Sequence, residues 1–153
     1  MKLYETKDKE QRIALNNWHS NDYCGSIIAG TGFGKSRCGV MAINHVLNTL
    51  GGTKALVLVP TTQLKDQFKE EFKKWDCEDC LDKVDVVCYQ SAYKFKDEHY
   101  DVVVCDEIHL GLSDKYRQFF NNNSYDKILC LTATPPEEPM YKLHLHLLAP
   151  TVY

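Results

Sequence analysis

The eight residues 29–36 constrain this chain more than any other segment. They read Ala-Gly-Thr-Gly-Phe-Gly-Lys-Ser, and the first of them, Ala29, ends a short apolar run that begins at Ser26. A glycine-rich loop between a buried strand and a helix lets several backbone N–H groups converge on one anion, because glycine adopts conformations closed to residues with a Cβ atom. The positive end of the following helix dipole lies at the same place. The pattern predicts a cradle for the phosphates of a nucleotide.

Two side chains of this loop have separate chemical roles. The Lys35 ammonium can reach the β- and γ-phosphates, and the Ser36 hydroxyl can bind Mg²⁺. The strict pattern has glycine where this chain has Ala29, so alone the loop indicates only nucleotide binding. The other candidate nucleotide-binding residues of the loop are Gly30, Thr31, Gly32, Phe33 and Gly34.

A pair of acidic residues follows a second segment that is predicted to form a strand. Residues 101–105 (Asp-Val-Val-Val-Cys) are typical of a strand buried on both faces, and Asp106 and Glu107 come directly after it. An acid at the tip of a neighbouring parallel strand would complete the magnesium site, so we expect Asp106 to bind the metal, partly through water. Glu107 would orient and deprotonate the attacking water. A solvated loop is the alternative for an isolated Asp-Glu pair, but the glycine loop makes the functional interpretation the stronger one.

Five motifs in order resemble those of superfamily 2 helicases and translocases. Asp106-Glu107-Ile108-His109 is similar to their DExH box, and residues 131–135 (Leu-Thr-Ala-Thr-Pro) resemble motif III. Residues 60–67 (Pro-Thr-Thr-Gln-Leu-Lys-Asp-Gln) resemble motif Ia, and 89–91 (Tyr-Gln-Ser) the segment around motif Ib in the branch that includes repair and phage recombination helicases. Gln11 and Trp18 resemble the nucleotide-sensing segment upstream of the glycine loop.

This resemblance implies ATP and Mg²⁺ as cofactors, with Lys35, Asp106 and Glu107 catalytic and with Ser36 and Asp106 as metal ligands. Gln11 would read the adenine edge; the alternative is an exposed helix glutamine. The residues implied to contact nucleic acid, or to couple it to the nucleotide, are Pro60, Thr61, Thr62, Gln67, Gln90, Ser91, His109, Thr132 and Thr134. For the threonines of motif Ia helix capping is a second interpretation, and both can hold. For those of motif III the alternative is a turn at the strand end.

Alternation of apolar runs and amphipathic segments predicts the fold. Five strands are expected, separated mainly by helices, which indicates a doubly wound parallel sheet with helices on both faces. The motif-bearing loops would lie at the carboxyl ends of the strands. The resemblance implies a three-layer α/β RecA-like lobe of a P-loop NTPase with a mainly parallel sheet. Strands are expected near 26–29, 54–59, 84–89, 101–105 and 127–131, and helices near 7–20, 35–50, 62–75 and 113–120.

With 153 residues, one core is expected. Residues 1–150 are assigned to the ATP-binding lobe and 151–153 to the start of an interdomain linker, because 141–153 resemble the family's passage out of its first lobe. The motifs of the second lobe are not found. We therefore expect a partner lobe, in the same or a separate chain, and weak or no activity alone. The arginine finger of such a lobe contributes roughly 10³–10⁵ in turnover.

The composition limits the expected binding partners and the expected cellular compartment. The net charge of −3 is not typical of a broad nucleic-acid surface, but helicase lobes can hold a strand through N–H groups, hydroxyls and helix N-termini. DNA is the expected partner, with RNA as the alternative. Seven cysteines, mostly in apolar runs, indicate reduced thiols and an intracellular location, which includes a phage or viral protein in its host. No run has the length of a membrane span, so no membrane partner is expected.

The sequence allows three other interpretations, a zinc site and two alternative functions. Cys77, Cys80, Cys88 and His99 are zinc-type ligands, but Cys88 falls within a predicted strand, which favours reduced thiols. A stand-alone lobe that binds nucleotide or nucleic acid without turnover remains a second function. A P-loop kinase of small molecules is a third, but it would need a basic lid, and residues 110–130 offer few cations.

Overall fold

The five predicted strands form one parallel sheet in the computed structural model, which describes residues 3–153, with side chains from Asp8 onward. The order across the sheet is β1-β5-β4-β2-β3, and every neighbouring pair is parallel. Four crossovers therefore connect the strands, as the alternating pattern predicted. The strands are β1 (Cys24–Ile28), β2 (Ala55–Val59), β3 (Val84–Cys88), β4 (His99–Cys105) and β5 (Ser124–Thr132).

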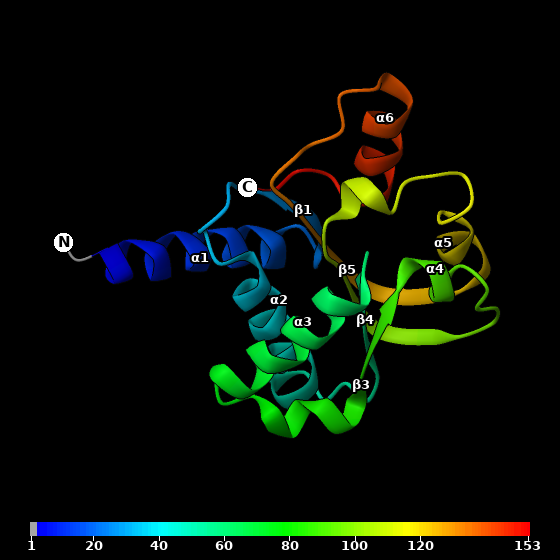
Figure 1. Ribbon diagram of the computed structural model, residues 1–153. Coiled ribbons are helices and arrows are strands. Elements are labelled where there is room, and N and C mark those ends of the chain that lie inside the picture. The colour runs from blue at the N-terminus through cyan, green and yellow to red at the C-terminus, as the bar shows by residue number, and fades with distance from the viewer. Residues whose placement is uncertain (1–2) are drawn as a thin grey trace.

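Helices cover both faces of this sheet (Figure 1). One face is packed by α1 (Leu3–Ser20), α2 (Lys35–Asn44) and α3 (Thr62–Lys74). The other is packed by α4 (Tyr89–Ala92), α5 (Gln118–Asn122) and α6 (Pro139–Leu148). The predicted three-layer α/β architecture is confirmed. Three shorter turns complete the chain: a π-helical turn His45–Thr49 and 3₁₀ turns Glu78–Lys83 and Ile108–Leu110.

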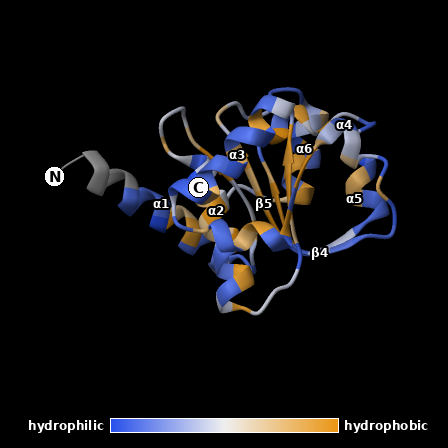
Figure 2. Cartoon of the chain, turned by 60° about the horizontal axis from the view of Figure 1, so that its bottom comes forward, coloured by the Kyte–Doolittle hydropathy of each residue, from blue (hydrophilic) through white to orange (hydrophobic). Residues whose placement is uncertain are grey.

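The hydrophobic core lies on both sides of the sheet, and β2 shows why. All five of its residues are buried, because successive side chains point to opposite faces and both faces are covered. Val57 and Val59 pack toward α1–α3, while Leu56 and Leu58 pack toward α4–α6. Figure 2 shows the apolar strands enclosed between more polar helices. None of the described helices combines the length and the apolarity that crossing a membrane requires.

Two local predictions differ from the structure. The helix expected from Ser113 to Phe120 is wrong over its first half, since α5 begins only at Gln118. Ser113 does act as a cap, because its hydroxyl accepts a hydrogen bond from the Tyr116 N–H (3.2 Å), but it caps a turn and not a helix. The 3₁₀ turn Glu78–Lys83 was not predicted.

The last residues of the chain lie along the free edge of β1. Thr151 pairs in parallel with Ser26, and the Val152 N–H donates to the Ser26 carbonyl (2.9 Å). The Ile28 N–H donates to the Tyr153 carbonyl at the same distance of 2.9 Å. Residues 151–153, which the sequence assigned to the start of a linker, are therefore hydrogen-bonded to the sheet of the lobe.

Candidate nucleotide-binding site

The glycine loop connects β1 to α2 and has the backbone conformation that glycine permits. Gly32 and Gly34 have φ angles of +89° and +87°, a region that other residues rarely adopt. A Cβ atom at Gly34 would also collide with the Gln11 amide nitrogen. The backbone conformation favours glycine at position 34, and a side chain there would also displace the Gln11 amide.

The Lys35 ammonium folds back over this loop. It donates hydrogen bonds to the carbonyls of Ala29 (2.7 Å) and Gly30 (3.2 Å). Lys35 and Ser36 are both half-buried in the first turn of α2, where the helix dipole is positive. An ammonium bonded only weakly to neutral carbonyls can exchange them for phosphate oxygens, which are stronger, charged acceptors.

Gln11 of α1 closes the other side of the loop. Its side chain is only 3% exposed, and its amide nitrogen donates to the Phe33 carbonyl (2.8 Å). Its carbonyl oxygen Oε1 is buried without a hydrogen-bond partner. Such an orphaned acceptor costs about 1–3 kcal/mol, so the site favours a ligand that brings an N–H donor. The alternative of an exposed helix glutamine is excluded.

Asp106 and Glu107 follow β4, and β5 lies between β4 and β1. The expectation that the acidic pair follows the strand next to the glycine loop was therefore wrong by one strand. Strand order depends on long-range pairing, and the local pattern does not contain it. The loops still meet, because all carboxyl ends of a parallel sheet share one edge.

The environment of Asp106 links the two loops electrostatically. Burial, and then repulsion from the Glu107 carboxylate, raise the pKa of Asp106 from 3.8 to about 6. The Glu107 N–H, which donates to Asp106 Oδ1 (3.1 Å), and the Lys35 ammonium lower the pKa of Asp106 in part. Asp106 therefore lies within the field of Lys35, and a bound cation would relieve its unfavourable charge.

Glu107 has a backbone conformation that the sequence did not reveal. Its φ and ψ are +48° and +50°, in the left-handed region that costs a non-glycine residue roughly 1–2 kcal/mol. Strained residues of this kind are held in place by their surroundings and cluster at functional sites. Here the strain turns the chain from β4 into the short turn that carries His109.

His109 joins the acidic box to motif III. Its Nδ1 lies 2.8 Å from the Thr132 hydroxyl oxygen, and its Nε2 lies 3.6 Å from a Glu107 carboxylate oxygen. The Thr132 hydroxyl donates to the Thr134 carbonyl (3.1 Å) and accepts from the Thr134 N–H (3.0 Å). The Thr132 hydroxyl donates its only proton to the Thr134 carbonyl. His109 Nδ1 is therefore the donor to the Thr132 hydroxyl oxygen. Hydrogen bonds thus join His109, Thr132 and Thr134, and Glu107 lies beside the other nitrogen of the same ring.

The other predicted residues lie on the same edge of the sheet, after β2 and β3. Thr61 caps α3, since its hydroxyl accepts from the Leu64 N–H (3.2 Å), so the capping interpretation holds. The side chains that remain exposed at this edge are Thr61, Thr62 and Gln67 on α3 and Gln90 and Ser91 on α4, while Pro60 is half-buried.

Two further residues contact these loops, and sequence reasoning gave them no role. The buried Tyr89 hydroxyl donates to the Asp106 carbonyl (2.8 Å). The Tyr153 ring packs against Phe33 of the glycine loop, with centroids 5.3 Å apart, and its hydroxyl bonds to the Glu10 carboxylate. Both tyrosines belong to segments with a family resemblance, but their contacts join parts far apart in the chain.

Shape alone would not have located this site. A cavity of about 460 Å³ lies between α1 and α2 and is lined by residues that include Leu15, Tyr23, Met41 and His45. No residue of the glycine loop lines it. The zinc alternative also finds no support in residues 8–153, where Cys77, Cys80, Cys88 and His99 do not come together.

Comparison with known proteins agrees with this geometry. The fold and the site define the RecA-like lobe of a superfamily 2 helicase. The sequence profile of DEAD/DEAH box helicases matches residues 8–98, more than half of the chain, and that of the type III restriction enzyme res subunit matches residues 77–137. The chain therefore belongs to the DEAD/DEAH box helicase family. None of the curated proteins matches the sequence significantly.

Solved structures share the fold at low sequence identity. The Hef helicase domain of Pyrococcus furiosus is 20% identical, with a TM-score of 0.67 over 90% of this chain and 35% of that one. The Sulfolobus solfataricus SWI2/SNF2 ATPase core in complex with dsDNA is 18% identical, with a TM-score of 0.72 over 95% and 35%. The UvsW helicase from bacteriophage T4 is 18% identical, with a TM-score of 0.66 over 83% and 53%. The chain thus spans about a third to a half of these proteins.

Proposed function

We propose that this chain is the ATP-binding and hydrolysing motor lobe of a superfamily 2 DNA helicase or translocase, which couples hydrolysis to movement on nucleic acid. The observation that carries the proposal is the meeting of Lys35, Asp106 and the Glu107–His109–Thr132 chain at one edge of the sheet. A phosphate-binding lysine, a half-buried acid and a candidate water-activating acid are the groups that this reaction requires.

The residues present fit ATP and Mg²⁺. The orphaned Gln11 oxygen is an acceptor for the exocyclic amine of adenine, and residues 30–36 would hold the phosphates. Ser36 and Asp106 would hold the Mg²⁺, which when bound neutralises charge on the β- and γ-phosphate oxygens. Asp106 is a half-buried acid whose charge Lys35 offsets only in part, and this suits a cation site. Glu107 would accept the proton of the attacking water.

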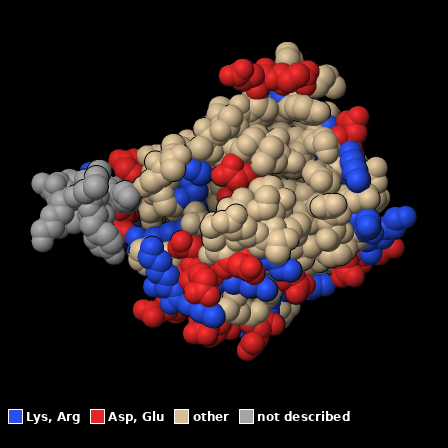
Figure 3. Space-filling model, viewed as in Figure 1, with Lys and Arg blue, Asp and Glu red and all other residues tan. Residues whose placement is uncertain are grey.

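DNA is the proposed partner, with RNA as the alternative. One structural neighbour is an ATPase core in complex with dsDNA. On the face in Figure 3, charged residues of both signs mix along the lower edge, over α3 and the turn Glu78–Lys83. Contact with a strand would therefore rest on Pro60, on the exposed Thr61, Thr62 and Gln67, and on Gln90 and Ser91. Hydroxyls, amides and helix N-termini can position a backbone without net positive charge.

A second RecA-like lobe, in the same or a separate chain, is the other proposed partner. Movement requires two lobes that close and open on ATP, and the second lobe supplies the arginine finger. The isolated lobe should bind ATP and turn it over slowly at most. We place its action inside the cell, in a reducing compartment.

Nucleotide binding is tested first on the chain alone. Lys35→Ala should weaken the binding of Mg-ATP at least ~10-fold, because it removes charge-assisted hydrogen bonds to phosphate. Lys83→Ala is the matched control, since Lys83 is exposed at the end of a turn remote from the loop. Equal affinity of the two variants would exclude the proposed phosphate site.

Turnover is tested after addition of a second lobe as a separate polypeptide. Nucleic-acid-stimulated hydrolysis should appear only in the mixture. Glu107→Gln should keep ATP binding and lose that hydrolysis, whereas full turnover in this variant would show that the water-activating role is misassigned. Binding of ATP without turnover in any mixture would instead favour a stand-alone binding module.

A further inference from the structure

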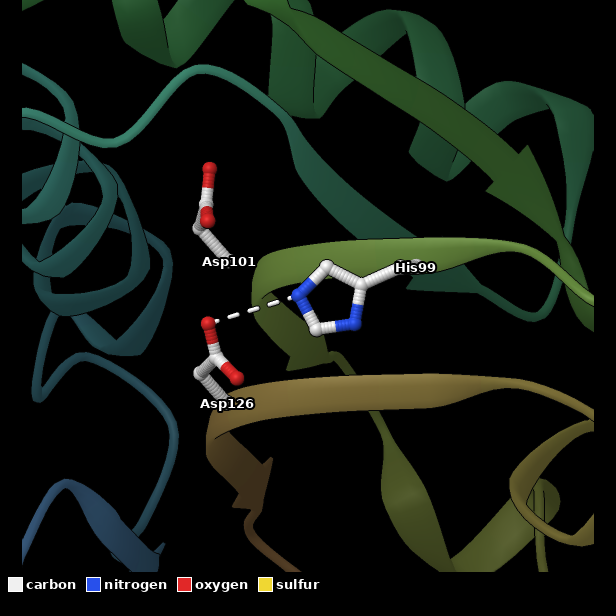
Figure 4. Close-up of side chains that lie close together, drawn as sticks. All are labelled: His99, Asp101 and Asp126. Atoms are coloured by element: carbon white, nitrogen blue, oxygen red, sulfur yellow. Dashed lines mark hydrogen bonds and ion pairs between the residues drawn. The ribbon is translucent and has the colours of Figure 1, made fainter.

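A second cluster of metal-ligating side chains lies near the amino ends of the strands, whereas the nucleotide site lies at their carboxyl ends. His99 and Asp101 belong to the amino-terminal part of β4, and Asp126 belongs to the same part of β5. One ligand atom from each residue lies within 4.8 Å of the other two. Figure 4 shows His99 and Asp126 turned toward one another, with Asp101 beside them. No helicase motif includes any of these residues.

The strand register brings the two carboxylates together. Tyr100 pairs with Tyr125 and Val102 with Lys127, so Asp101 and Asp126 occupy the intervening positions on neighbouring strands. Like charges opposite one another across two strands are unfavourable. A cation between them would replace this repulsion by attraction.

The imidazole of His99 is already oriented for a ligand. Its Nδ1 lies 2.7 Å from the Ser124 hydroxyl oxygen, and its Nε2 lies 3.3 Å from Asp126 Oδ2. When Nδ1 carries the proton, it donates to Ser124, and the lone pair of Nε2 then faces a carboxylate oxygen. Two acceptors at this distance need a proton or a metal ion between them. Metal-binding histidines are generally held in this way through their second nitrogen.

Asp101 is fixed by the loop before β2. Its Oδ2 accepts hydrogen bonds from the backbone N–H groups of Thr53 (2.6 Å) and Lys54 (2.9 Å). A carboxylate has about four lone-pair positions, so two such bonds leave capacity for a metal ion. One ligand is thus held rigidly by the backbone, and a second is oriented by Ser124.

We propose that His99, Asp101 and Asp126 form a binding site for a divalent transition-metal ion such as Zn²⁺, separate from the nucleotide site. Zinc accepts imidazole and carboxylate ligands at about 2.0–2.2 Å, and two tetrahedral ligands are then about 3.3–3.5 Å apart. The His99–Asp126 distance of 3.3 Å already matches. The side chains of His99 and Asp126 are 53% and 55% exposed, which gives them room to move closer to Asp101 and lets water complete the coordination. The bound ion would join β4 to β5.

Zinc binding to the nucleotide-free chain tests this proposal by titration calorimetry and thermal unfolding. One Zn²⁺ should bind per chain, and the unfolding midpoint should rise by roughly 5–10 °C at a hundredfold excess over the Kd. His99→Ala and Asp126→Asn should each weaken the binding at least ~10-fold. His146→Ala, which removes an exposed histidine of α6, is the matched control and should bind normally.

The cysteines provide the competing explanation, because thiolates also bind zinc. The double variant Cys77→Ser with Cys80→Ser should keep the affinity of the unmodified chain. Loss of binding in that variant, unchanged binding in both His99→Ala and Asp126→Asn, or no zinc binding at all would overturn the proposal. His99→Ala should still bind Mg-ATP normally, so failure of the zinc site and failure of the proposed function give different results.

Discussion

The Tyr89 hydroxyl donates a 2.8 Å hydrogen bond to the backbone carbonyl of Asp106. Tyr89 begins α4 after β3, whereas Asp106 follows β4, and β2 lies between these two strands. Gly111, just beyond the acidic box, approaches the same ring so closely that a Cβ atom would lie 2.7 Å from its Cζ. The backbone of the acidic box is thus held against Tyr89, and we assign Tyr89 a positioning role.

Replacement of Tyr89 by phenylalanine should measure this bond. Tyr89→Phe keeps the buried ring but leaves the Asp106 carbonyl without its partner, so the free energy of unfolding should fall by about 1–2 kcal/mol. Urea unfolding followed by circular dichroism checks this. Tyr93→Phe is the control, because Tyr93 packs against the same Tyr116 ring but is partly exposed. Equal stability of both variants would show that the bond contributes nothing.

The Thr132 hydroxyl offers a test of coupling between the acidic box and motif III. Thr132→Val removes the group that His109 and the Thr134 N–H both contact, at nearly constant volume. If the proposed function holds, Mg-ATP affinity should change less than about threefold, while stimulation of the two-lobe ATPase by nucleic acid should fall at least ~10-fold, as expected for loss of about two hydrogen bonds.

Thr49→Val, an exposed threonine after α2, serves as the control for that variant and should behave as the unmodified chain. Full stimulation of the Thr132→Val enzyme would mean that the hydrogen bonds of Thr132 with His109 and Thr134 have no part in coupling.

The sequence predicted what local patterns determine. Residues 102–105 are all apolar, and a strand buried on both faces was predicted from that run. The position of β5 between β1 and β4 was not predictable, because pairing between distant strands sets that order. The helix start predicted at Ser113 was wrong because a serine hydroxyl can cap a turn as well as a helix.

The same division holds within the site. The glycine loop and the acidic box were recognised from residue types and spacing alone. The burial of Gln11 depends on the Phe33 carbonyl 22 positions away, and the role of Tyr89 depends on a carbonyl 17 positions away. The left-handed backbone of Glu107 could not be predicted either, because glutamate has no intrinsic preference for that region.

Two glycines of the loop should respond differently to alanine. Gly34→Ala places a side chain at φ +87° and against Gln11, so we expect a loss of about 1–3 kcal/mol in unfolding free energy. Gly30→Ala is the matched control, since a Cβ atom there meets nothing within 4 Å. Urea unfolding without nucleotide separates this effect from binding. A Gly34→Ala protein as stable as Gly30→Ala would contradict the close contact between α1 and the loop.

The half-buried charge of Asp106 should destabilise the nucleotide-free fold. The folded pKa of about 6 lies above the unfolded value of 3.8, so the folded state binds more protons between these values. Stability from this group therefore falls as the pH rises through about 4–6, and the full penalty is present above pH 6. Asp106→Asn removes the charge and should raise the free energy of unfolding by about 1–3 kcal/mol at pH 7.5.

Thermal or urea unfolding in the presence of a chelator measures that gain at two pH values. At pH 5 the gain should shrink to about half, because Asp106 is then largely protonated in the folded state. Asp66→Asn, an exposed aspartate on α3, should change stability little at either pH. The Asp106→Asn chain should also lose its magnesium dependence of ATP binding, so the more stable variant is the inactive one. A less stable Asp106→Asn chain at pH 7.5 would mean that hydrogen bonds to the carboxylate outweigh its burial.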